Sequence, residues 1–172
     1  MNSHLVTTIV GPDRTGLVES VARVVAAHGG NWLESRMCRL GGEFAGILRI
    51  EIPSTQSAAL LAALKGLAGL TVTVQSGHAV APAGGRLTGL EIVGSDRPGI
   101  VRDITSALAR AGVNVEEFSS EISSAPMSGE PLFKAVARLQ LPAGCNLAAL
   151  KAELEKIAAD LLVDVSLEEV VA

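Results

Sequence analysis

The chain has 172 residues, 48% of them hydrophobic and 19% charged, and a formal net charge of −4. This length fits one large domain or two small ones, and the hydrophobic content excludes an intrinsically disordered chain. Aromatic residues make up only 2% of the chain, so we expect neither a stacking platform for single-stranded nucleic acid nor, given the negative charge, a basic phosphate-binding surface. No apolar run is long enough to span a membrane.

Few residues suggest enzymatic or metal chemistry. The two cysteines, Cys38 and Cys145, lie far apart without a CxxC spacing, which is typical of reduced thiols. The three histidines have no metal-ligand spacing, and no base is placed beside Cys38 to make it a nucleophile. The N-terminus lacks the basic segment of a signal peptide. We therefore expect a cytoplasmic protein that is not an enzyme and needs no metal or cofactor.

An internal repeat organises the chain. Residues 11–37 match residues 94–120 at an offset of 83, and the match continues near residue 52 at an offset of 89, so the second copy carries six extra residues. The segment between the copies, residues 77–86, is rich in Gly and Pro and is predicted to be a linker. The predicted domains are residues 1–76 and 87–172.

Each copy gives the same predicted elements in the same order. A strand (5–10 and 87–93) is followed by an amphipathic helix whose apolar residues recur on one face (17–28 and 100–111), with Gly29 and Gly112 just after the last turn. A hairpin follows, with its turn at Gly41-Gly42 in the first copy and at 123–131 in the second, where we place the extra residues. A second helix and a final strand complete each copy. The order β-α-β-β-α-β predicts an α+β protein of two ferredoxin-like units, each with an antiparallel sheet and both helices on one face.

The motif Asp-Arg-x-Gly after the first strand, followed by Gly-x-Asn at the start of the second, resembles the ACT domain, a small regulatory module that binds amino acids. It occurs as Asp13 to Gly16 with Asn31, and as Asp96 to Gly99 with Asn114. The resemblance implies a ligand held between this loop of one ACT unit and the second strand of another. The candidate ligand-binding residues are Asp13, Gly16, Asn31, Asp96, Gly99 and Asn114.

The chemistry of these residues suits an α-amino acid. The helix N-terminus after each loop favours a carboxylate, an aspartate could pair with the ammonium group, and an asparagine offers both a donor and an acceptor. Structural roles stay open for the same residues. The aspartates could cap the helices, the asparagines could adopt a turn conformation after glycine, the glycines could serve helix–sheet packing, and Arg14 and Arg97 could be solvated.

The resemblance implies a non-enzymatic regulator that senses a small amino acid, glycine or serine first. Its implied partner is a protein, a DNA-binding regulator of glycine cleavage genes. Residues 82–172 have a net charge of −5 against +1 for residues 1–81, so we expect no direct contact with nucleic acid. Exposed strand edges favour a homodimer or larger assembly. Two alternatives remain: an interaction module without a ligand, and a regulatory homologue of the ACT half of formyltetrahydrofolate deformylase.

Overall fold

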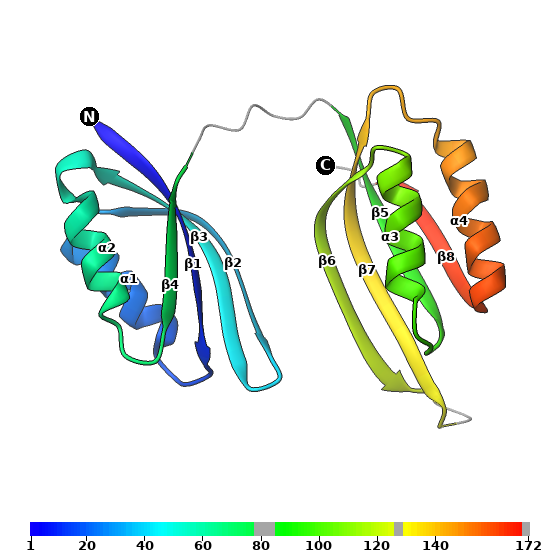
Figure 1. Cartoon of the computed structure of the whole chain (residues 1–172), viewed down its shortest axis with the longest axis horizontal. Coiled ribbons are helices and arrows are strands. Elements are labelled where there is room, and N and C mark those ends of the chain that lie inside the picture. Colours follow the sequence, from blue (N-terminus) through cyan, green and yellow to red (C-terminus); the bar gives the residue numbers. More distant parts are fainter. Residues whose placement is uncertain (78–84, 126–128, 170–172) are drawn as a thin grey trace. The chain divides into compact units, whose positions relative to one another are not determined.

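The computed structural model describes residues 1–77, 85–125 and 129–169. The chain divides into two compact units, unit 1 (Met1–Ala81) and unit 2 (Pro82–Ala172), which we describe separately (Figure 1). The linker expected at residues 77–86 is shorter at its C-terminal end, because a strand already begins at Gly85. Residues 78–84 of that linker lie outside the described residues.

Unit 1 is a four-stranded antiparallel sheet with both α-helices on one face (Figure 1). Its strands lie in the order β2-β3-β1-β4. The elements are β1 (Asn2–Pro12), α1 (Leu17–Ala27), β2 (Asn31–Leu40), β3 (Glu43–Pro53), a single 3₁₀ turn η1 (Ser54–Gln56), α2 (Ser57–Lys65) and β4 (Thr71–Ser76).

Unit 2 repeats this arrangement with the strand order β6-β7-β5-β8. Its elements are β5 (Gly85–Ser95), α3 (Ile100–Arg110), β6 (Asn114–Ser124), β7 (Pro131–Pro142), α4 (Leu147–Leu161) and β8 (Val163–Glu169). The α+β class and the two ferredoxin-like units are therefore confirmed. The strands are longer than predicted at both ends, because hydrogen bonding continues past the last buried residue.

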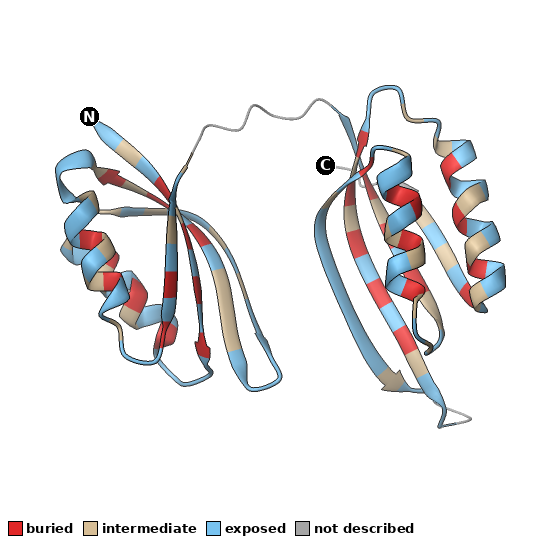
Figure 2. Cartoon of the chain, in the orientation of Figure 1, coloured by how far each residue is buried: buried red, intermediate tan, exposed pale blue. Residues whose placement is uncertain are grey.

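Alternation along the strands places one face of each sheet against its helices. In β3, Leu48, Ile50 and Ile52 are almost completely buried, while their neighbours Ile47 and Arg49 are exposed. In β7 the buried set is Ala135, Ala137, Leu139 and Leu141. Both sets face the helices of their own unit. Figure 2 shows the resulting buried positions along the central strands and on the inner sides of the helices.

The hairpins account for the extra length of the second copy. Two residues separate β2 from β3, whereas six separate β6 from β7, and the two strands of the second hairpin are each one residue longer than their counterparts. The six-residue difference therefore lies in this hairpin, as predicted; residues 126–128 of its loop lie outside the described residues.

None of the helices in the described part of the chain is long and apolar enough to cross a membrane.

The two faces of β3 predict unequal responses to truncation. Leu48→Ala removes a side chain that is 1% exposed and should lower the free energy of unfolding by about 2–5 kcal/mol, because a cavity remains in the core. Ile47→Ala, one residue away on the open face and 45% exposed, should cost less than about 1 kcal/mol. Urea unfolding of both variants measures the difference; equal losses would contradict the one-sided core.

Candidate functional site

The loop after the first strand of each unit ends in a glycine, because the backbone there adopts a left-handed conformation. Gly16 and Gly99 are the N-cap residues of α1 and α3, with φ of 87° and 103°, and neither helix has a side-chain cap. A capping role for Asp13 and Asp96 is therefore wrong. A Cβ at Gly16 would meet no atom within 4 Å, so helix–sheet packing does not explain this glycine; the left-handed φ does.

Equivalent hydrogen bonds hold the two loops in place. The amide of Asp13 donates to the Gly42 carbonyl at 2.8 Å, and the amide of Asp96 donates to the Pro131 carbonyl at 3.0 Å. These two acceptors are related by the repeat offset of 89.

The arginines of the motif reach backbone carbonyls at or just after the end of the second helix. The guanidinium of Arg14 donates to the carbonyl of Ala68 at 2.8 Å, and that of Arg97 donates to the carbonyl of Asp160 at 3.4 Å. Asp160 lies in the last turn of α4, where cations are favoured beside the helix carbonyls, whereas Ala68 lies three residues after the end of α2. Both hydrogen bonds are exposed to solvent, so they tie each loop to its own unit without contradicting the expectation of solvated charges.

The asparagines lie at the other end of each sheet from these loops. Asn31 begins β2 and pairs with Glu51, which pairs with His4 near the start of β1. Asp13 follows the end of β1, nine residues further along, or about 30 Å at the rise of an extended strand. Asn114 pairs with Gln140, and Gln140 with Leu87, so the same separation holds in unit 2. One unit alone does not bring its aspartate and glycine together with its asparagine.

Both asparagines are exposed strand residues, and neither has the positive φ that a left-handed turn would need. The turn-conformation alternative is therefore wrong. The side-chain amide of Asn114 donates to the carboxylate of Glu116 at 2.7 Å.

The aspartates of the two loops have different surroundings. The carboxylate of Asp13 forms an ion pair with Arg39 at 2.7 Å. The position that corresponds to Arg39 in unit 2 is Ile122, since both residues pair with the equivalent phenylalanine of the next strand. Among the described residues no cation pairs with Asp96.

The first turns of α1 and α3 also differ in charge. Arg102 lies in the first turn of α3, and a Cβ built on Gly99 would be 3.3 Å from its guanidinium. Arg102 donates to the Asp103 carboxylate at 2.7 Å, and this hydrogen bond holds the pKa of Asp103 below its usual value. The position that corresponds to Arg102 in unit 1 is Glu19, which pairs with Arg23. The first-turn charges of both helices are therefore paired with a neighbour, and the loops differ in their aspartates: Arg39 compensates Asp13, whereas Asp96 has no such cation among the described residues.

The sheet face opposite the helices carries a second feature in unit 1. We call the central nine of its outward residues on β1, β2 and β3 the open face of unit 1: Val6, Thr8, Val10, Glu34, Arg36, Cys38, Ala45, Ile47 and Arg49. Two hollows of about 310 and 420 Å³ lie on it and share Arg36 and Ile47 in their walls.

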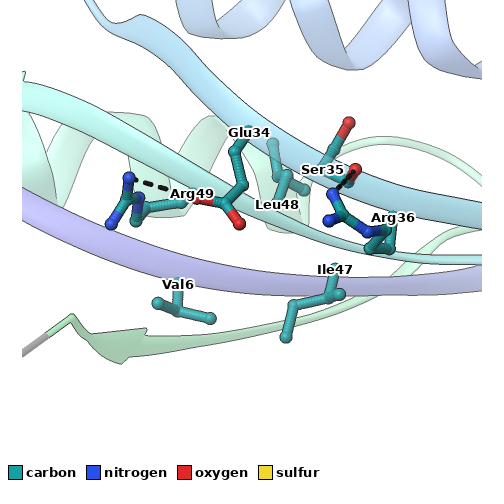
Figure 3. A pocket seen from close by; sticks show the side chains of 7 residues that line it. All are labelled: Val6, Glu34, Ser35, Arg36, Ile47, Leu48 and Arg49. Carbon is teal, nitrogen blue, oxygen red and sulfur yellow. Dashed lines mark hydrogen bonds and ion pairs between the residues drawn. The ribbon is translucent and has the colours of Figure 1, made fainter. Parts of the chain in front are cut away.

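Figure 3 shows the first hollow, in which Val6 and Ile47 lie beside the ion pair of Glu34 with Arg49, 3.1 Å long. We did not predict these hollows from the sequence. The one sequence feature that pointed to them was the run of outward apolar residues in β1 and β3. Alternation alone assigns these residues to solvent.

The described residues hold no group of three or more His, Cys, Asp or Glu side chains that could bind a metal ion. Cys38 and Cys145 are both free thiols.

Comparison with known families agrees with this architecture. Family models of the ACT domain match residues 3–75 and residues 88–136, so the chain belongs to the ACT domain family and carries two such domains in tandem. The crystal structure of an unknown protein from Galdieria sulphuraria superposes with a TM-score of 0.90 at 30% identity, covering 99% of this chain and 100% of that one.

A second structure, that of a candidate glycine cleavage system transcriptional repressor, superposes with a TM-score of 0.70 at 25% identity. It covers 100% of this chain and 99% of that chain. A formyltetrahydrofolate deformylase from Pseudomonas putida KT2440 covers 49% of this chain and 29% of that chain, with 19% identity and a TM-score of 0.43. No curated protein sequence matches the chain significantly. The chain is thus a tandem ACT protein similar over its whole length to a candidate repressor of the glycine cleavage system.

The role of the N-cap glycine is testable without a ligand. Gly16→Ala should lower the free energy of unfolding by about 1–2 kcal/mol, because alanine is strained at a left-handed φ. Gly144→Ala is the control: a Cβ there also meets no atom within 4 Å, and Gly144 lacks a positive φ. It should change the free energy of unfolding by no more than about 0.5 kcal/mol. Equal effects in urea unfolding would contradict the conformational role.

Proposed function

We propose that this protein is a non-enzymatic regulator that senses a small amino acid through its ACT domains and acts on a protein partner. The observation that carries the proposal is the match of a candidate glycine cleavage repressor to the entire chain, both ACT domains included. By that similarity the partner is a DNA-binding regulator of glycine cleavage genes. The net charge of −4 is consistent with DNA contact through the partner rather than through this chain.

The geometry supports a sensing site shared between ACT domains. The loop and the asparagine of one unit lie at opposite ends of its sheet. A complete set of the candidate ligand-binding residues therefore needs the loop of one ACT domain beside the second strand of another. The second strands β2 and β6 are edge strands, and unpaired edges favour association. A homo-oligomer is therefore part of the proposal.

Within this proposal, the loop of unit 2 is the better amino-acid site. The carboxylate of Asp96 is available to an ammonium group, and a ligand carboxylate at the α3 N-terminus would lie near Arg102, where it would compete with the carboxylate of Asp103. In unit 1, Arg39 already occupies the carboxylate of Asp13, and Glu19 would repel the carboxylate of a ligand. The repeat thus supplies one receptive loop and one that is internally compensated.

A thermal-shift screen of the twenty amino acids tests the sensing role. At about 100 times Kd a ligand adds about 2.7 kcal/mol of stability, which should raise Tm by at least about 5 °C for a chain of this size. We expect glycine or serine to give this shift. Asp96→Asn should abolish most of it, because the ammonium group loses its counter-charge, and Asn114→Ala should reduce it.

Asp13→Asn is the matched control and should leave the shift in place. A flat screen at millimolar amino acid would favour the interaction module without a ligand. A shift that survives Asp96→Asn and Asn114→Ala would place the site elsewhere.

A further inference from the structure

We propose that unit 2 binds unit 2 of a second copy of this chain, with the two β6 strands antiparallel and Ser120 on the two-fold axis. This inference rests on the proposed function, since it names the ACT domain that completes the amino-acid site of unit 2.

Strand β6 is a long edge strand with little protection against pairing. It lies at the end of the order β6-β7-β5-β8 and has 11 residues, against 7 in β8 at the other edge. It contains neither Pro nor Lys, which commonly prevent an edge from pairing. Its register with β7 shifts only between Val115 and Glu117, so the strand is regular from Glu117 onwards. The free backbone groups along β6 are therefore suited to pairing with another strand.

Two apolar side chains on the helix side of β6 are exposed at this edge. Phe118 and Ile122 pair with buried residues of β7 and therefore lie on the helix side of the sheet. Phe118 is nevertheless 39% exposed, and Ile122 is 63% exposed. Unit 1 has Ser35 and Arg39 at the equivalent positions. The apolar edge is thus a feature of unit 2 rather than of the shared fold.

Helix α3 adds a third apolar residue to this edge. Arg110 of α3 forms an ion pair with Glu153 of α4 at 2.6 Å. Val101 lies nine residues earlier, which at about 100° per residue is the opposite side of α3. Figure 1 shows α3 between β6 and α4, so Val101, which is 39% exposed, lies on the side of α3 towards β6. A second copy paired with β6 would cover these apolar side chains.

The sequence of β6 is self-complementary when it pairs antiparallel about Ser120. Paired residues share a face of the sheet, and in this register Phe118 of each copy lies opposite Ile122 of the other. Glu121 then lies opposite Ser119. A shift of the axis by one residue in either direction would instead set two glutamates opposite each other, which destabilises a cross-strand pair.

The same arrangement completes the amino-acid site. The amide of Asp96 donates to the carbonyl of Pro131, which pairs with Ser124 at the end of β6. Asn114 begins that strand. Antiparallel pairing brings the start of β6 in one copy to the end of β6 in the other, so Asn114 of the second copy reaches the end of the sheet where the Asp96 loop lies. Each two-fold pair then has two such sites, one per chain.

Disulfide trapping in the full-length chain tests the pairing. Ser120→Cys is combined with Cys38→Ser and Cys145→Ser and treated with oxidised glutathione. Cysteines paired at the axis would have Cα atoms about 4.5–5.5 Å apart, which a disulfide can span, so we expect a disulfide-linked dimer on a non-reducing gel. Met37→Cys in the same background, at the equivalent position of unit 1, is the matched control and should stay largely uncrosslinked.

Sedimentation equilibrium provides a second measurement. Ile122→Glu should raise the Kd of self-association at least about tenfold, because the substitution occurs twice at a two-fold interface. Val136→Glu is the control, since Val136 is 58% exposed on the opposite face of the same sheet. It should leave the Kd unchanged.

Three results would overturn the pairing: no crosslink in Ser120→Cys, equal crosslinking in Met37→Cys, or an unchanged Kd for Ile122→Glu. The amino-acid screen separates this proposal from the sensing role. A chain that crosslinks through Ser120→Cys but shows no thermal shift would support the pairing and defeat the sensing role. A wild-type monomer that keeps a thermal shift dependent on Asp96 would support the sensing role and defeat the pairing.

Discussion

The antiparallel pairing of β1 with β3, and of β5 with β7, is the constraint on which the rest of the structure depends. Because paired residues share a face, the pairing decides which side chains meet the helices and which remain on the open face. The register runs along the whole of both strands. As a result, the glycine loop after the first strand and the asparagine at the start of the second strand lie at opposite ends of each unit. The burial pattern and the split candidate site therefore have the same origin.

The two units carry different side chains on the same fold. Both keep the N-cap glycine, the arginine that bonds to a carbonyl at or just after the end of the second helix, and the ion pair on the face opposite the helices. They differ where a ligand would bind, because Ile122 of unit 2 stands at the position of Arg39 in unit 1. In our proposal, unit 2 binds the amino acid.

The sequence was sufficient for the elements and for the core, because the periods of 2 and 3.6 residues directly report which face of a strand or helix is buried. Leu48, Ile50 and Ile52 illustrate this. Gly29 and Gly112, expected to end the first helices with positive φ, do so at 69°.

The contacts of the motif residues were not predictable in the same way. Nothing local in the sequence indicates that Arg14 bonds to Ala68, 54 residues away, or that Arg39 pairs with Asp13. Such contacts depend on the register of distant strands and helices. The hollows on the open face were missed for a related reason, because alternation assigns outward residues to solvent without saying how the surface is shaped.

The central claim is that only one of the two similar domains senses the amino acid. The number of amino-acid molecules bound per chain tests this claim most directly. Isothermal titration calorimetry of the full chain with the responding amino acid should give one site per chain. Arg39→Ile gives unit 1 the residue found in unit 2. It should raise the number of sites per chain only if Glu19 does not by itself exclude the carboxylate of the ligand. Asp13→Asn should leave the number of sites at one. Two equivalent sites per chain in the wild type, or a single site that persists in Asp96→Asn, would contradict the account.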